Sequence, residues 1–207
     1  MPNNSSGSKT VTPQQIKELR ERTGAGILEC KNALIQSEGN QEEAVRILRA
    51  KGASIASEKA GREAKAGLVG AYVHGGRIGV LVEINCETDF VARTEEFKTL
   101  VNEICLQIAS MNPQFVSRDD VPPEEISATL EHLHEQIEGA DDEGAQSMQQ
   151  SYMEKYYKEI VLLDQPYVRD TSKTIQDLLH DAVTSMRENI VIRRFIRYTL
   201  GEKLPES

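Results

Sequence analysis

The histidines, which could serve as metal ligands or general bases, are too scattered in this sequence to form a site. His132 and His134 are two residues apart on a predicted helix, so their side chains diverge by about 200° and cannot share a metal at the i, i+4 spacing of helical sites. His74 and His180 have no serine or cysteine that the sequence links to them, which leaves a nucleophilic triad unsupported. We therefore predict no catalytic cluster, no metal site and no cofactor.

The cysteines are odd in number and do not suggest a redox or zinc centre. Cys30, Cys86 and Cys105 form no Cys-x-x-Cys pair, and each lies within an apolar pattern. This usage is typical of small buried side chains in a reducing cytosol.

The glycine-rich segments do not form a nucleotide-binding loop. Gly75-Gly76-Arg77-Ile78-Gly79 lacks the strand-to-helix context of a dinucleotide loop, and the sequence contains no glycine-rich loop ending in Lys-Ser or Lys-Thr. We expect that the chain does not itself bind a nucleotide.

Binding of nucleic acid is also disfavoured. Thr23-Gly24-Ala25-Gly26 could present backbone N–H groups to phosphates, as a helix-hairpin-helix module does, but Glu29 follows where a basic residue would help. The net charge is -9, only 5% of the residues are aromatic, and residues 113–165 carry 3 basic and 13 acidic side chains. A protein–protein role is favoured over contact with DNA or RNA.

The segment Asn85-Cys86-Glu87-Thr88-Asp89-Phe90-Val91-Ala92-Arg93 allows two interpretations. In the first, a strand ends, Thr88 caps a helix, Asp89 interacts favourably with the helix dipole, and Phe90 and Val91 pack in the core. In the second, the same side chains are exposed and contact a partner. The residues by themselves favour the first interpretation, since apolar side chains at helix starts usually pack inward.

Three short helices are predicted near the N-terminus, after a disordered lead-in over residues 1–10. Thr12, Pro13 and Gln15 have the pattern of a capping box, and Asn40 with Glu43 can cap the third helix in the same way. Gly52 is expected to end the third helix. We predict a three-helix domain over residues 11–52 and an exposed helical linker over residues 53–66.

From Gly67 the apolar period changes from helical to alternating, which predicts a β-hairpin around Gly75-Gly76. A long amphipathic helix follows, starting at either Thr88 or Thr94, and then an acidic helical hairpin over about residues 122–163. Another helix over residues 174–186 and a third strand over residues 189–198 complete the pattern. The fold class is α+β, with a core over residues 67–201 built on a small three-stranded antiparallel sheet, and a tail over residues 202–207.

The sequence has no targeting or membrane-spanning pattern. No stretch approaches the roughly 18 consecutive apolar residues of a membrane span, and the N-terminus lacks the apolar region of a signal peptide. We expect a soluble, cytoplasmic protein with no membrane partner.

Five motifs, in order, resemble those of the elongation factor Ts family between about Val11 and Gly201. The first is Leu19 to Gly26 with Cys30-Lys31, the second is His74 with Arg77 to Glu83, and the third is Thr88 to Arg93; Gln165 to Val168 and Glu188 to Phe195 follow. The sequence has one hairpin and one Thr-Asp-Phe-Val segment, so it resembles the short bacterial-type form. Residues 139–157 depart from the basic run usual in the family, and we transfer no functional residue across them.

The resemblance implies a guanine nucleotide exchange factor that binds elongation factor Tu carrying GDP, and no covalent chemistry. It implies that Thr88, Asp89, Phe90 and Val91 dislodge Mg²⁺ from the partner so that GDP leaves and GTP can bind. It further implies that the N-terminal module is UBA-like and docks on the GTPase domain of elongation factor Tu through Arg20, Ile27 and Leu28. His74 of the hairpin is expected close to the same contact. Since relatives of full length carry a duplicated core, the single core predicts a homodimer in which two small sheets pack together.

A rival hypothesis is a small helical adaptor, in which the N-terminal module binds nucleic acid or a ubiquitin-like partner and the rest of the chain is scaffold. Acceleration of GDP release from elongation factor Tu would separate the two hypotheses.

Overall fold

A computed structural model describes residues 11–136 and 142–203 of the chain. The predicted lead-in over residues 1–10, much of the predicted turn of the helical hairpin and most of the predicted tail lie outside the described residues. By internal contacts the chain divides into two compact units, one made of the residues up to Ala64 with Asp177–Ile190, the other of Lys65–Gln176 with the residues from Val191 onward.

The first unit is built on three N-terminal helices, α1 (Pro13–Thr23), α2 (Ile27–Gln36) and α3 (Gln41–Lys59). The predicted capping box of α1 is confirmed, because the Gln15 N–H donates to Thr12 Oγ1 at 3.2 Å and the Thr12 N–H donates to Gln15 Oε1 at 2.9 Å. Asn40 caps α3 by accepting from the N–H groups of Glu42 and Glu43, as predicted, but the Glu43 carboxylate pairs with Arg46 and does not complete the predicted capping box. The core between the helices consists of Leu19, Cys30, Ala33, Leu34, Ala44 and Val45.

Helix α3 does not end at Gly52, as the sequence predicted, but continues to Lys59. A single glycine within a helix costs only about 1 kcal/mol relative to alanine, which is too little to stop a helix that has contacts on both sides of it. The C-terminal part of this unit supplies such contacts, since Gly52 lies against His180 and Thr184, and the Lys59 ammonium donates to the Arg187 carbonyl at 2.7 Å. The domain boundaries drawn from the sequence stay a prediction.

The second unit contains the predicted three-stranded antiparallel sheet, formed by β1 (Ala66–His74), β2 (Ile78–Cys86) and β5 (Val191–Thr199) in the order β1-β2-β5. Gly75 and Gly76 have φ angles of 55° and 68°, which are the positive values that a two-residue hairpin turn requires. The α+β fold class is therefore confirmed, with the third strand where it was expected.

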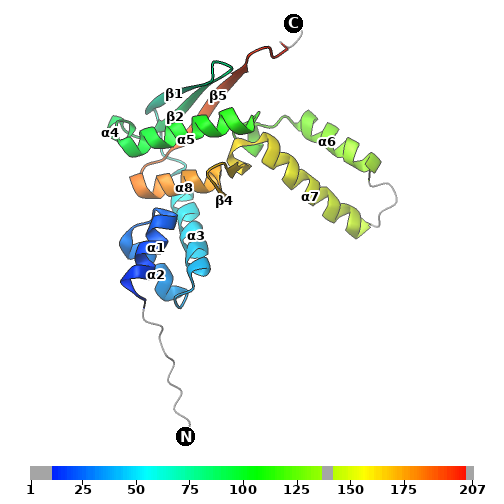
Figure 1. Cartoon of the computed structure of the whole chain (residues 1–207). Coiled ribbons are helices and arrows are strands. Elements are labelled where there is room, and N and C mark those ends of the chain that lie inside the picture. The colour runs from blue at the N-terminus through cyan, green and yellow to red at the C-terminus, as the bar shows by residue number, and fades with distance from the viewer. Residues whose placement is uncertain (1–10, 137–141, 204–207) are drawn as a thin grey trace. The chain divides into compact units, whose positions relative to one another are not determined.

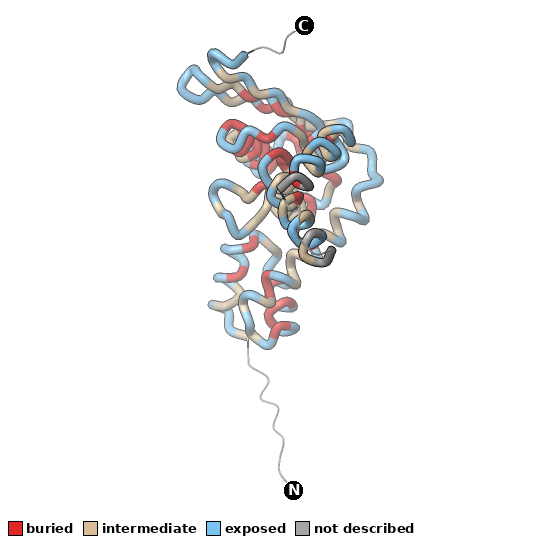
Figure 2. Tube along the Cα trace, turned by 90° about the vertical axis from the view of Figure 1, so that its right-hand side faces the viewer, coloured by how far each residue is buried: buried red, intermediate tan, exposed pale blue. Residues whose placement is uncertain are grey.

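One face of the sheet is covered by the long helix α5 (Glu95–Met111), as Figure 1 shows. The helix buries Phe97, Leu100, Val101, Ile104 and Ile108, and the strands contribute Val80, Val82 and Ile84 to the same layer. In Figure 2 the buried segments are drawn red. They include residues of this layer and of the N-terminal helices, and Val161, Leu162 and Ile175 are buried as well.

The rest of the second unit forms a helical hairpin and its base. It comprises η1 (Arg118–Asp120), α6 (Pro123–Gln136), α7 (Asp142–Ile160), η2 (Leu162–Asp164), and a small hairpin of β3 (Pro166–Tyr167) and β4 (Asp170–Thr174) that the sequence analysis did not predict. Helix α8 (Ile175–Met186), most of which belongs to the first unit, then leads to β5. Gln107 of α5 joins this region by donating to Gln165 Oε1 and to the Pro166 carbonyl, and by accepting from the Val168 N–H.

The three cysteines are buried, as the sequence predicted, and none of them forms a disulfide bond. Burial raises the pKa of the Cys105 thiol to about 11 and also raises the pKa of Cys30. Since the thiolate is the reactive form, both thiols act as small apolar side chains.

Replacement of Gly70 by alanine tests the packing of α5 on β1. A Cβ atom at Gly70 would lie 2.3 Å from Val101 Cγ1 and 3.1 Å from Cys105 Sγ. We expect Gly70→Ala to lower the free energy of unfolding by about 1–3 kcal/mol, the usual cost of overpacking. Gly79→Ala is the matched control, because a Cβ atom there meets nothing within 4 Å. Urea unfolding at one protein concentration compares the two, and equal stabilities would contradict this account of the packing.

Candidate functional site

The segment from Thr88 to Arg93 forms a separate short helix between the sheet and α5. Strand β2 ends at Cys86, and α4 (Asp89–Ala92) is followed by α5 from Glu95. Thr88 and Thr94 are both N-caps: the Val91 N–H donates to Thr88 Oγ1 at 3.4 Å, and the Phe97 N–H donates to Thr94 Oγ1 at 3.2 Å. The two helix starts that the sequence left open are therefore both used, one for each helix.

The two ends of α4 are tied to the second unit by short contacts. Ala92 is buried, the Cys86 thiol donates to the Thr88 carbonyl at 3.2 Å, and the Thr94 hydroxyl donates to the Val91 carbonyl at 2.8 Å. A turn held at both ends presents its middle residues in a fixed direction.

Phe90 lies in the middle of this turn and is 86% exposed, the largest exposed fraction among the large hydrophobic side chains of the described residues. The residues by themselves favoured the interpretation in which Phe90 packs in the core, and that interpretation is wrong for this chain. Asp89 is also exposed and lies 3.8 Å from the Arg93 guanidinium, while Val91 is half-buried. An exposed phenylalanine beside a carboxylate has the character of a contact surface, because apolar side chains of this size are seldom left in water without a partner.

His74 lies at the other end of the β1–β2 hairpin. The register pairs His74 with Ile78 beside the turn and Ala66 with Cys86 beside α4, as Figure 1 shows by placing α4 and the hairpin turn at opposite ends of the sheet. Eight strand residues of about 3.3 Å each separate the two ends, which gives a distance of roughly 26 Å. Within one chain, His74 and Phe90 are therefore not in one contact patch.

Ile27, Leu28 and Arg20 belong to the first unit. Ile27 and Leu28 begin α2 and are 63% and 68% exposed, and Arg20 is exposed in the last turn of α1. The core of the unit is made by the opposite side of α2, from Cys30, Ala33 and Leu34. Helix α2 thus has an apolar surface that this unit leaves uncovered.

The outer face of the sheet is a second apolar surface, which the sequence analysis did not identify residue by residue. The register places Ala71, Leu81 and Ile196 in one row and Val73, Gly79 and Tyr198 in the next, on the side away from α5. The large apolar side chains of this outer face are exposed; they are Val69, Val73, Leu81, Ile196 and Tyr198. The ion pair of Glu83 and Arg194 lies on the same face, in the row of Val69. An antiparallel sheet with one free face normally carries polar residues there, so an apolar free face indicates a covering partner.

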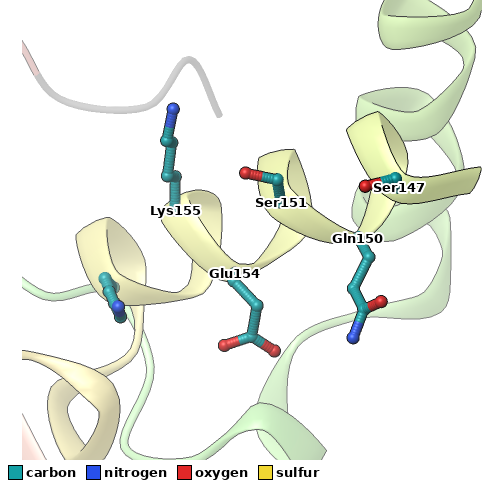
Figure 3. A pocket seen from close by; sticks show the side chains of 6 residues that line it. Ser147, Gln150, Ser151, Glu154 and Lys155 are labelled. Atoms are coloured by element: carbon teal, nitrogen blue, oxygen red, sulfur yellow. The ribbon is translucent and has the colours of Figure 1, made fainter. Parts of the chain in front are cut away.

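A shallow hollow along α7 has none of the features of an active site. It is lined by polar side chains, shown in Figure 3: Ser147, Gln150, Ser151, Glu154, Lys155 and Lys158. Glu154 accepts a hydrogen bond from Arg118, which lowers the pKa of its carboxyl. Arg118 also pairs with Asp164 at 2.6 Å and lies over the Tyr157 ring at 4.5 Å, so these charges hold the base of the hairpin together.

The described residues contain neither a metal cluster nor a membrane-spanning helix. Over residues 11–136 and 142–203, no three His, Cys, Asp or Glu side chains are placed to hold a metal ion. None of the described helices is long and apolar enough to cross a membrane.

Comparison with known proteins gives matches that agree on the family. The family model described as Elongation factor TS matches residues 10–202. The chain is 53% identical to elongation factor Ts of Caldanaerobacter subterraneus subsp. tengcongensis over 195 residues, which cover 93% of this chain and 98% of that protein. It is 50% identical to elongation factor Ts of Acetivibrio thermocellus, over 95% of this chain and 93% of that protein, and 44% identical to that of Moorella thermoacetica, over 95% and 98%.

The exposure of Phe90 can be tested without a partner. Phe90→Ala should change the free energy of unfolding by no more than about 0.5 kcal/mol, as expected for an exposed side chain. Phe97→Ala is the matched comparison, since Phe97 is fully buried and its truncation should cost about 3–5 kcal/mol. Chemical denaturation measures both, and a large loss of stability for Phe90→Ala would show that its side chain packs in the core.

Proposed function

The chain belongs to the elongation factor Ts family, the nucleotide exchange factors of elongation factor Tu, and we propose that its α4 turn is the part that opens the nucleotide site. The observation that supports this role is the 86% exposure of Phe90 on a turn held at both ends. Thr88 caps the turn, Asp89 and Phe90 reach the partner, and Val91 supports the turn from its half-buried position.

The proposed action is a wedge that displaces Mg²⁺ from elongation factor Tu. Mg²⁺ requires nearly ideal octahedral geometry and keeps several waters, so a small shift of the loops that hold it weakens its binding sharply. The diphosphate of GDP then loses its main counter-charge, and GDP dissociates faster. No covalent bond has to form or break in this chain.

A wedge of this kind must be ordered before it docks. The caps at Thr88 and Thr94 and the buried Ala92 fix the backbone of α4 in the free protein, so little conformational entropy is lost on binding. The binding energy is then available to distort the partner.

Release of the factor follows from linkage. If this chain weakens the binding of GDP, a bound nucleotide must weaken the binding of this chain by the same factor. Entry of GTP therefore expels the exchange factor and completes the cycle. We place this activity in the cytoplasm, where elongation factor Tu acts in translation.

The other contacts proposed with elongation factor Tu come from both units. Ile27 and Leu28 offer an exposed apolar surface beside the charge of Arg20, which suits docking on the GTPase domain. His74 supplies a polar contact from the turn of the hairpin.

A homodimer would cover the outer face of the sheet. Leu81 lies in the middle of β2, opposite Ile196 of β5, so a two-fold axis passing near this pair would pack two apolar faces against each other. If that axis lies in the plane of the interface and perpendicular to the strands, it also exchanges the ends of the hairpin and brings the partner subunit's His74 toward the Phe90 turn of the first copy. A dimer therefore offers a physical reason why two groups at opposite ends of a hairpin roughly 26 Å long could serve one contact.

Stopped-flow release of a fluorescent GDP analogue from elongation factor Tu tests the wedge. The wild-type chain should accelerate release strongly, and Asp89→Ala and Phe90→Ala should each lower the stimulated rate by about tenfold or more, as expected for central contact residues. Met148→Ala, at an exposed apolar residue of α7, is the matched control and should keep the wild-type rate. Wild-type rates for both α4 variants, with melting temperatures unchanged, would rule out the wedge.

Analytical ultracentrifugation tests the dimer. The wild-type chain should sediment as a dimer, and Leu81→Asp should yield monomers because a charge cannot be buried unpaired at the centre of an apolar interface. Met148→Asp, at an exposed position outside the outer face of the sheet, should remain dimeric. A wild-type monomer at all concentrations that still exchanges GDP fully would contradict the proposal.

A mixing experiment can then test whether the dimer shares its sites. His74→Ala and Phe90→Ala chains, mixed after dissociation and allowed to reassociate, form some mixed dimers with one intact pair of His74 and Phe90. Such a mixture should be more active than either variant alone. Activity equal to the mean of the two variants would show that each chain acts by itself.

A further inference from the structure

We propose that Tyr72 is a positioning residue for His74, and that it holds the imidazole with the proton on Nε2, so that His74 presents an N–H donor to elongation factor Tu. The observation is a 2.9 Å hydrogen bond between the Tyr72 hydroxyl and His74 Nδ1. The two rings are 6.1 Å apart between centroids, with 33° between their planes. The inference rests on the proposed docking role of His74 and deepens it.

The backbone around the pair is fixed, so the two side chains meet in one geometry. Tyr72 and His74 are two residues apart on β1 and therefore lie on the same face of the sheet. Tyr72 pairs with Val80 and His74 with Ile78, and the Arg77 N–H donates to the His74 carbonyl at 2.9 Å to close the turn. Arg77 is held in turn by the residue that follows β5, since its carbonyl accepts from the Leu200 N–H at 2.8 Å.

The chemistry of the two groups decides the direction of the hydrogen bond. A phenol hydroxyl is a stronger acid than the N–H of a neutral imidazole, and an imidazole nitrogen is a stronger base than a phenol oxygen. The Tyr72 O–H therefore donates and Nδ1 accepts. Because a neutral imidazole carries one proton, that proton is on Nε2.

This arrangement defines what His74 can recognise. Nδ1 is occupied by Tyr72, and the exposed His74 ring leaves Nε2–H facing water in the free protein. The complementary group on elongation factor Tu is an acceptor oxygen, either a backbone carbonyl or a carboxylate. Without Tyr72, the ring would exchange between both tautomers and several rotamers, and docking would have to select one of them.

Nitrogen NMR of the free protein tests the tautomer directly. In the ¹⁵N-labelled chain at about pH 8, above the range in which histidine ordinarily titrates, the two-bond ¹H–¹⁵N spectrum should show a protonated Nε2 and an unprotonated Nδ1 for His74. His74→Gln identifies the signals by their loss. Tyr72→Phe should move both nitrogen shifts toward the average of the two tautomers. A proton on Nδ1 in the wild type, or a spectrum unchanged by Tyr72→Phe, would overturn the inference.

A double-mutant cycle tests the positioning role. Tyr72→Phe should weaken binding to nucleotide-free elongation factor Tu by about 3- to 10-fold, as expected for the loss of one hydrogen bond that orders a contact. In a His74→Ala background the same change should have almost no effect. Equal effects in both backgrounds would overturn the positioning role of Tyr72.

The NMR measurement and the double-mutant cycle distinguish a failure of the Tyr72 positioning role from a failure of the His74 docking role. If His74→Ala binds as tightly as the wild type, His74 is not a contact and the positioning role fails with it, whatever the NMR spectrum shows. If His74→Ala weakens binding but the tautomer is wrong, the docking role of His74 stands and the role of Tyr72 is overturned. Unchanged melting temperatures for all variants show that differences in binding arise from docking and not from a loss of folded protein.

Discussion

The close packing of α5 on β1 holds the two groups of the second unit that we propose contact elongation factor Tu. These groups are Phe90 on α4 and His74 on β1. Gly70 has no side chain, so Val101 and Cys105 of the helix can approach the strand more closely than any Cβ atom would allow. This contact and the buried Val80 and Val82 of β2 fix the hairpin against the helix. The two ends of the hairpin are thereby held in place, one carrying α4 and the other His74.

The exposure of Phe90 is made possible by the order of its surroundings. An exposed phenylalanine on a flexible loop would collapse onto the nearest apolar surface, whereas Phe90 lies on a turn whose ends are held by Thr88, Ala92 and Thr94. The fixed turn therefore keeps the Phe90 side chain in contact with water. This is the usual relation between a strained or unfavourable local feature and function.

Polar contacts within the second unit fix the base of its helical hairpin. Gln107 and Gln165 are buried and bonded to each other, and Gln165 also donates to the Glu159 carbonyl. Such groups are tolerated in a core only when they have partners, so they specify one arrangement of α5 and the base of the hairpin. Arg118 adds charged hydrogen bonds to Glu154 and Asp164 at the same base.

The sequence by itself determined the features that depend on near neighbours along the chain. The capping box of Thr12 and Gln15, the cap at Asn40 and the Gly75-Gly76 turn are local interactions, and all were identified correctly. Periodicity gave the strands and the long helix because their apolar faces repeat regularly, and the ordered motifs indicated the family. The start at Thr88 or Thr94 stayed open because both threonines have the chemistry of a cap.

Only the tertiary structure decided which apolar residues are inside. Phe90 and Phe97 are both phenylalanines near a helix start, and yet one is 86% exposed and the other fully buried, because only Phe97 has the sheet beneath it. The continuation of α3 through Gly52 and the apolar outer face of the sheet likewise depend on residues distant in sequence, as does the joining of Asp177–Ile190 to the N-terminal helices. Local pattern shows that a side chain is apolar, whereas its burial depends on whether another segment of the chain lies over it.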